Sequence, residues 1–253
     1  MMILTLAQRE LRSLFLSPLA WSILAIMQAV LALYFLFNLD YFLSIQAQLQ
    51  DLESPPGATE LVIAPLYGIA GFISMIIVPL LTMRLISEER RNRSIALLFS
   101  APVSMTEIIL GKYLGLLGFL LLAIGLISLM PLSLLLGGPL DYGLLLALIL
   151  GLFFLLACFA AVGLFFSTLT AQPIIAAIST IGSLLLLWII DLSGYQSGES
   201  VTSSLLAYIS IKRHFETLSL GSVNSSDIVY FVLFITLFLV LGIRRLDADR
   251  LQH

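Results

Sequence analysis

The segment that decides the fold reads RLISEERRNRSIALLFSAPVSMTEIILGK and spans residues 84–112. It contains five of the twelve Lys and Arg residues of the chain and lies between two long apolar segments. Four apolar side chains within it recur at helical spacing: Ile95, Leu98, Phe99 and Pro102. This pattern predicts a short charged helix held between two membrane-spanning helices.

The composition of the whole chain is that of a membrane protein. Hydrophobic residues make up 60% and charged residues 11%, whereas a soluble domain has roughly 25% charged residues. Irregular backbone cannot satisfy its hydrogen bonds in lipid, so the spanning segments are expected to be helices. We therefore predict an all-α integral membrane protein. The single cysteine, Cys158, excludes an intrachain disulfide and a cysteine metal cluster.

Six segments have the length and apolar character that a spanning helix needs, about 20 residues. They cover residues 18–39, 61–86, 108–136, 142–169, 173–190 and 227–243. The polar patch Ser167 to Pro173 divides an uncharged run that is too long for one span, and it predicts a tight hairpin. We expect these spans to form one transmembrane domain over residues 1–253.

The first 17 residues predict an amphipathic helix in the membrane interface. Phe15 lies on the apolar face, Arg9 and Arg12 lie opposite, and Glu10 lies at the edge of the apolar stripe. Ser17-Pro18 is a natural break before the first span. A signal peptide is disfavoured, because the apolar run after Pro18 is long enough to cross a bilayer.

The basic residues set the orientation. Ten lie in segments that share one side with the N-terminus: Arg9, Arg12, Arg84, Arg90, Arg91, Arg93, Lys112, Arg244, Arg245 and Arg250. The opposite side has only Lys212 and Arg213. By the positive-inside rule both termini and the loop of residues 87–107 are expected in the cytoplasm.

Two segments are expected outside. Residues 40–60 carry acids and a Pro-Pro-Gly turn, which indicates a short solvated excursion. Residues 192–226 mix polar residues with a few apolar ones: Leu205, Leu206, Tyr208, Ile209 and Phe215. Two interpretations stay open for them, an amphipathic or re-entrant helix and a surface loop with its own packing cluster.

The apolar cores of the spans lack ionisable groups, which disfavours an ion-coupled or proton-coupled transporter. His214 and His253 have no metal-ligand partner at useful spacing, and we expect both to be solvated. No nucleophile comes with an identifiable base, so an intramembrane enzyme is poorly supported.

The chain also lacks a loop that cradles phosphates. Its one Gly-Lys pair, Gly111-Lys112, is followed by Tyr113, and Thr106 stands where the first glycine of the motif belongs. If ATP drives this protein, ATP and Mg are bound by a separate chain and not by this one.

Motifs along the whole chain resemble those of ABC-2 type transporter permeases, and they are most similar to the gliding-motility-associated branch. The first set is Arg9-Glu10, Phe15, Ser17-Pro18, Pro79-x-x-Thr82-Met83-Arg84, Glu88-Glu89, Arg93-Ser94, Pro102-Val103-Ser104 and Ile109-x-Gly111-Lys112. The second set is Gly163-Leu164-Phe165-x-Ser167-x-Leu169-Thr170, His214-Phe215-Glu216, Gly221 and Asp227-Ile228-Val229-Tyr230-Phe231.

The resemblance implies a bacterial inner-membrane subunit that works with ABC ATPase subunits. In such families a coupling helix in the first cytoplasmic loop docks in a cleft of the ATPase. Carried onto this sequence, the docking residues are Glu88, Glu89, Arg91, Arg93, Ser94, Ile95, Leu98, Phe99 and Pro102. The N-terminal elbow helix would contribute Arg9, Glu10, Arg12 and Phe15.

The residues themselves support this docking role, because an apolar stripe with a charged surround suits helix-in-groove binding. The alternative is a basic loop on anionic lipid, but Glu88 and Glu89 among the arginines favour a protein partner.

The expected function is that of a permease subunit that couples ATP hydrolysis to export or to mechanical signalling. The expected partners are a second permease copy, the same or similar, membrane lipid and an auxiliary protein with a large extracytoplasmic domain, but no nucleic acid. A passive membrane anchor or assembly factor is the main alternative, and an intramembrane enzyme is the weaker one.

Overall fold

The computed structural model describes residues 2–49, 57–92, 103–136, 140–196 and 208–250, and these contain helices and turns without a strand. The elements are α1 (Met2–Leu16), α2 (Pro18–Leu49), η1 (Thr59–Ile63), α3 (Ala64–Thr82), α4 (Ser87–Arg91), α6 (Met105–Ser133), η2 (Leu134–Leu136), α7 (Tyr142–Leu169), α8 (Pro173–Gln196), α10 (Ile211–Ser219) and α11 (Ser225–Arg250). Within these residues, six helical segments are long and apolar enough to cross a membrane. The prediction of an all-α integral membrane protein with six spans is confirmed.

The second span differs from the continuous helix expected over residues 61–86. It begins with the π-helical turn η1, continues as α3 to Thr82, and turns before the short helix α4. The third span begins at Met105, because Ser104 and Glu107 form a capping box in which each side chain accepts a hydrogen bond from the backbone N–H of the other. Helices α2 and α11 both continue past the apolar runs that predicted them, to Leu49 and Arg250.

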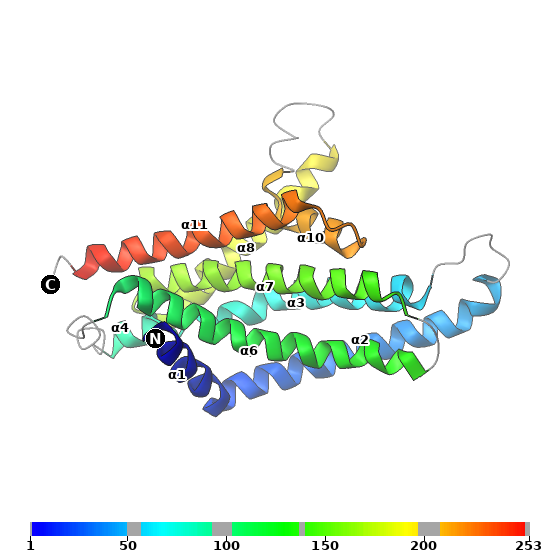
Figure 1. Ribbon diagram of the computed structural model, residues 1–253, viewed down its shortest axis with the longest axis horizontal. Coiled ribbons are helices and arrows are strands. Elements are labelled where there is room, and N and C mark those ends of the chain that lie inside the picture. The colour runs from blue at the N-terminus through cyan, green and yellow to red at the C-terminus, as the bar shows by residue number, and fades with distance from the viewer. Residues whose placement is uncertain (1, 50–56, 93–102, 137–139, 197–207, 251–253) are drawn as a thin grey trace.

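Helix α7 forms the centre of the bundle and packs against α3, α6, α8, α10 and α11 (Figure 1). Its side chains from Leu155 to Leu164 are all buried. By contrast α2, α8 and α11 keep large exposed apolar side chains, among them Phe37, Leu186 and Leu233. These outer helices therefore supply much of the apolar surface that a bilayer would cover.

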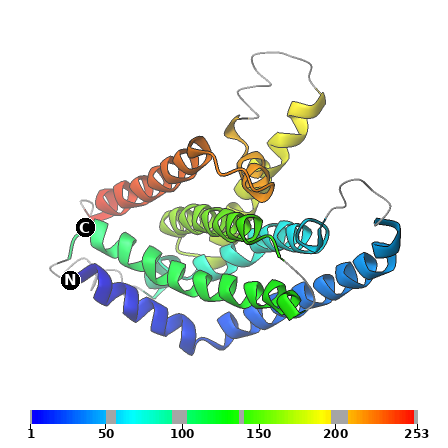
Figure 2. The same ribbon diagram turned by 45° about the vertical axis from the view of Figure 1, so that its right-hand side comes forward.

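The segment after α8 folds back between the spans. Phe215 and Leu218 of α10 are buried against Gly71 of α3 and Gly151 of α7, where a Cβ atom would come within 3.4 Å of Phe215 and 3.2 Å of Leu218. Gly151 lies roughly 14 Å along α7, at 1.5 Å per residue from Tyr142. Figure 2 shows α10 beside α7 and not beyond its end. The residues 192–226 thus contain an amphipathic helix that enters the bundle, whereas Leu205 and Leu206 lie outside the described residues.

The expectation that His214 is solvated is wrong. The residue is 5% exposed, and its Nδ1 lies 2.6 Å from Oδ1 of Asp227, the third residue of α11. Its Nε2 lies 2.9 Å from the carbonyl oxygen of Tyr208, and its ring stacks on Tyr230 with centroids 4.0 Å apart. The error arose because sequence spacing does not show that α10 folds back onto α11. His253 lies outside the described residues.

Candidate functional site

Five segments meet at one end of the bundle, the end at which α4 ends and α6 begins. These are α1, α4, the beginning of α6, the hairpin between α7 and α8, and the C-terminal end of α11 (Figure 1). Most of the basic residues that the structure describes lie on these elements, whereas Lys212 and Arg213 lie on α10. We call this end the junction end.

A row of glycines on α6 lets α1 lie against it at very short range. A Cβ atom at Gly111 would come within 2.6 Å of Cβ of Leu6, and one at Gly115 within 2.7 Å of Cβ of Glu10. Gly118 continues the row one turn further, against Leu11. Small residues spaced in this way allow two helices to approach closely in a membrane protein. The close approach places Glu10 beside the third span.

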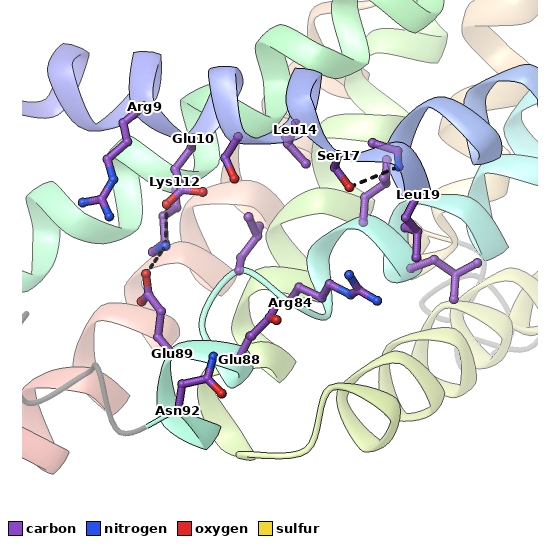
Figure 3. Close-up of a pocket in the computed structure, with 15 residues that line it drawn as sticks. Arg9, Glu10, Leu14, Ser17, Leu19, Arg84, Glu88, Glu89, Asn92 and Lys112 are labelled. Atoms are coloured by element: carbon purple, nitrogen blue, oxygen red, sulfur yellow. Dashed lines mark hydrogen bonds and ion pairs between the residues drawn. The ribbon is translucent and has the colours of Figure 1, made fainter.

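Lys112 lies at the centre of the junction end and is only 5% exposed. Its Nζ lies 2.6 Å from Oε1 of Glu10 on α1 and 2.8 Å from Oε1 of Glu89 on α4. Figure 3 shows the ammonium group between the two carboxylates. One buried cation therefore joins the interfacial helix, the short helix α4 and the third span, and we call these three residues the Lys112 clamp.

A second ion pair joins α4 to α11. Arg90 pairs with Asp249 in the last turn of α11, and Arg245 lies 3.5 Å from the other carboxylate oxygen of Asp249. Glu89 and Arg90 are neighbours in the chain, so α4 is joined to two different groups of helices through two successive residues.

A hydroxyl of α7 holds the turn that leads into α4. Ser167 Oγ accepts hydrogen bonds of 3.1 Å from the backbone N–H groups of Ile86 and Ser87, and it donates one of 3.2 Å to the carbonyl of Met83. Four residues earlier, Gly163 makes room for Thr82, because a Cβ atom there would overlap the threonine side chain. These contacts replace the backbone hydrogen bonds that are lost where α3 ends.

Two hollows flank the same turn. One, of about 310 Å³, lies between α1, α2, α3, α4 and α6 (Figure 3). The other, of about 490 Å³, lies between α4 and the beginning of α8. Arg84 and Glu88 line both hollows.

The residues predicted as a coupling site divide into two groups. Three lie on α4: Glu89 is in the Lys112 clamp, Glu88 is half-buried beside the hollows, and Arg91 is exposed. The other six lie outside the described residues: Arg93, Ser94, Ile95, Leu98, Phe99 and Pro102.

The predicted elbow residues lie on α1. Arg9 and Arg12 are exposed, while Glu10 turns toward Lys112. Phe15 packs edge-on against Phe119 with ring centroids 5.7 Å apart, and its carbonyl accepts a 2.7 Å hydrogen bond from Trp21 Nε1. The aromatic contacts hold the corner where α1 meets α2.

Sequence reasoning did not find the residues that hold α4 in place, namely Lys112, Asp249 and Ser167. The glycine spacing 111, 115 and 118 was a readable sign that a helix packs there, but it does not say which helix. No group of three metal-ligating side chains occurs in the part of the chain that the structure describes. The arrangement is suited to holding and moving helices.

Comparison with known protein families gives one match that covers nearly the whole chain. A family model described as ABC-2 family transporter protein matches residues 4–251. A comparison with curated proteins found no match.

Proposed function

Because the chain belongs to the ABC-2 family of transporter proteins, we propose that it couples ATP hydrolysis in a separate ATPase subunit to work across the membrane. Membership makes it a membrane permease subunit of an ABC transporter, a class of transport subunit that generally has no catalytic activity of its own. ABC ATPases and a second permease copy are the partners that this family implies.

The attachment of α4 is the observation that carries the proposal. In our proposal residues 93–102 dock in the ATPase through Ile95, Leu98 and Phe99. Glu88 and Arg91 set the orientation of docking, because charges at an interface rim govern register and partner choice more than affinity. The remaining docking residues are Glu89, Arg93, Ser94 and Pro102.

The displacement of the docking segment would reach the bundle through α4. The Lys112 clamp connects α4 to α1 and α6, so these helices would be displaced with it. The Arg90–Asp249 pair connects α4 to α11, and Ser167 connects it to α7. Packed helices move as rigid bodies when such a contact set is displaced. A movement at the ATPase thereby becomes a movement of several spans.

We propose that the chain lies in a bacterial inner membrane and that the junction end is on its cytoplasmic side. The gathering of basic side chains at this end supports that orientation, since cytoplasmic segments are rich in Lys and Arg. Both termini then lie inside. The permease would form a dimer, either with a second copy of itself or with a similar permease. The two bundles would then provide twelve spans above two ATPase subunits.

The work done could be export or mechanical signalling to an auxiliary protein with a large extracytoplasmic domain. The motif resemblance to the gliding-motility-associated branch supports the second. A passive anchor is the alternative, and it predicts that the chain has no influence on ATP hydrolysis.

The proposal is tested by purifying the tagged chain from its native membrane and identifying the ATPase that accompanies it. ATP hydrolysis is then measured for that ATPase alone and after co-reconstitution with the chain in liposomes. We expect an ABC ATPase to co-purify and its turnover to change on reconstitution. An ATPase whose turnover is the same with and without the chain would favour the passive anchor.

A further inference from the structure

The hollow of about 310 Å³ at the junction end has two unlike walls. Apolar side chains at the corner of α1 and α2 and at the end of α3 form one wall: Leu14, Leu19, Ala20, Leu80 and Leu81. The other wall carries charge from α1, α4 and the turn after α3 (Figure 3). This hollow lies beside the first turns of α6, where the amphipathic helix α1 packs. An amphipathic helix of this kind lies at the depth where the chains and headgroups of lipids meet.

The hollow has equal numbers of basic and acidic residues, but not all of them form ion pairs with one another. Its three basic residues are Arg9, Arg84 and Lys112, and its three acidic residues are Glu10, Glu88 and Glu89. The Lys112 clamp pairs one cation with two of the carboxylates. Arg9, Arg84 and Glu88 form no ion pair with any residue that the structure describes.

We propose that this hollow holds the headgroup of a zwitterionic phospholipid with a primary amine, of the phosphatidylethanolamine type. The guanidinium of Arg84 binds the phosphate, a geometry for which the planar fork of arginine is well suited. The carboxylate of Glu88 accepts hydrogen bonds from the ammonium group. The acyl chains lie along the apolar wall beside Leu19 and Leu80.

The charge balance favours this headgroup over an anionic one. A purely anionic lipid would satisfy Arg84 but would leave Glu88 beside a second negative group. A choline headgroup has no N–H to donate to Glu88. The hydroxyls of a glycerol headgroup can donate to Glu88 but do not neutralise its charge. A headgroup with both a phosphate and an ammonium group offers each residue an opposite charge.

A lipid in this place would join α1 and α2 to α3 and α4 and would support the corner on which the Lys112 clamp depends. The proposal does not depend on docking of an ATPase. A negative result for lipid binding would therefore leave the proposed coupling to an ATPase untouched, and a negative result for that coupling would leave the lipid site untouched.

The test is native mass spectrometry of the purified full-length chain in detergent. The chain is incubated with equal concentrations of phosphatidylethanolamine, phosphatidylcholine or phosphatidylglycerol that carry the same acyl chains. We expect the ethanolamine lipid to be retained most. Arg84→Gln should lower retention of all three lipids, by about tenfold if one charge-assisted contact is lost.

Glu88→Gln separates the two contacts. It should remove the preference for ethanolamine over choline while leaving choline binding unchanged. Arg244→Gln is the matched control, since Arg244 is an exposed arginine at the same end of the fold and does not line the hollow. It should bind lipids as the wild type does.

Three results would overturn the proposal. One is equal retention of the ethanolamine lipid by the wild type and by Arg84→Gln in protein of unchanged thermal stability. Another is a stronger preference for phosphatidylglycerol. The third is displacement of the lipid by soluble glycerophosphoethanolamine at matched concentration, which would assign the site to a free phosphate compound.

Discussion

The ammonium of Lys112 lies 2.8 Å from the carboxylate of Glu89, so the third span is joined directly to the short helix that precedes residues 93–102. Glu10 shares the same ammonium from the opposite side. The contact therefore connects three elements that are far apart in the sequence.

Replacing Lys112 by Met should destabilise the protein. The change leaves two partly buried carboxylates facing each other without the cation between them, and breaking a buried ion pair from one side costs about 3–5 kcal/mol. Thermal unfolding in detergent, followed by fluorescence-detected size exclusion, measures the effect.

The triple variant Glu10→Gln, Lys112→Met and Glu89→Gln provides the control for this prediction. It removes all three charges together and should recover much of the lost stability. A triple variant as unstable as Lys112→Met would contradict the assignment of the loss to unpaired charge.

Gly115→Ala should weaken the packing of α1 on α6. The added methyl group would meet Cβ of Glu10 at 2.7 Å and the carbonyl oxygen of Ala7 at 2.8 Å, and the backbone atom cannot turn aside. Overpacking of this kind costs typically 1–3 kcal/mol. Gly125→Ala is the matched control on the same helix, because nothing lies within 4 Å of its Cβ position. Equal midpoints for the two variants would refute the close approach.

Ser167→Ala should loosen the turn into α4. It removes the acceptor for two buried N–H groups, and one unsatisfied buried group costs about 1–3 kcal/mol. Amide hydrogen exchange at Ile86 and Ser87 should become faster. Ser22→Ala removes an exposed hydroxyl that bonds only within its own helix, so it should leave exchange at these two amides as in the wild type.

His214→Phe should destabilise the fold of α10 against α11. Asp227 is itself only 5% exposed, and its Oδ2 has no hydrogen-bond partner in the described structure, so the variant leaves a buried carboxyl group without the hydrogen bond to His214 Nδ1. We expect a loss of about 1–3 kcal/mol, measured as a lower unfolding midpoint. The double variant His214→Phe with Asp227→Leu should be more stable than His214→Phe alone. If it were less stable still, the pair would not be the cause.

The six spans could be predicted from the sequence because burial in lipid requires long uncharged runs, and such runs are local. The hairpin between α7 and α8 was equally local, since the polar patch that predicts it, Ser167 to Pro173, is one continuous short segment. The break of the second span before α4 was not visible, because the acceptor that stabilises it is Ser167, some eighty residues away.

The charged residues of the site were harder to place. Glu10 appeared as an imperfection of an amphipathic stripe until the glycine row of α6 brought it to Lys112. His214 was expected to be solvated, because no local pattern shows that it meets Asp227 in the interior. Pairings between distant residues depend on packing, and one sequence does not contain them.

The most direct test of the central claim is retention of the ABC ATPase by the double variant Ile95→Asp with Leu98→Asp. The matched control is Leu220→Asp with Val223→Asp, two exposed apolar residues between α10 and α11. Co-purification from membranes at equal expression measures the complex. We predict that the first variant loses the ATPase and that the control keeps it, whereas a complex of wild-type yield with the first variant would contradict docking through residues 93–102.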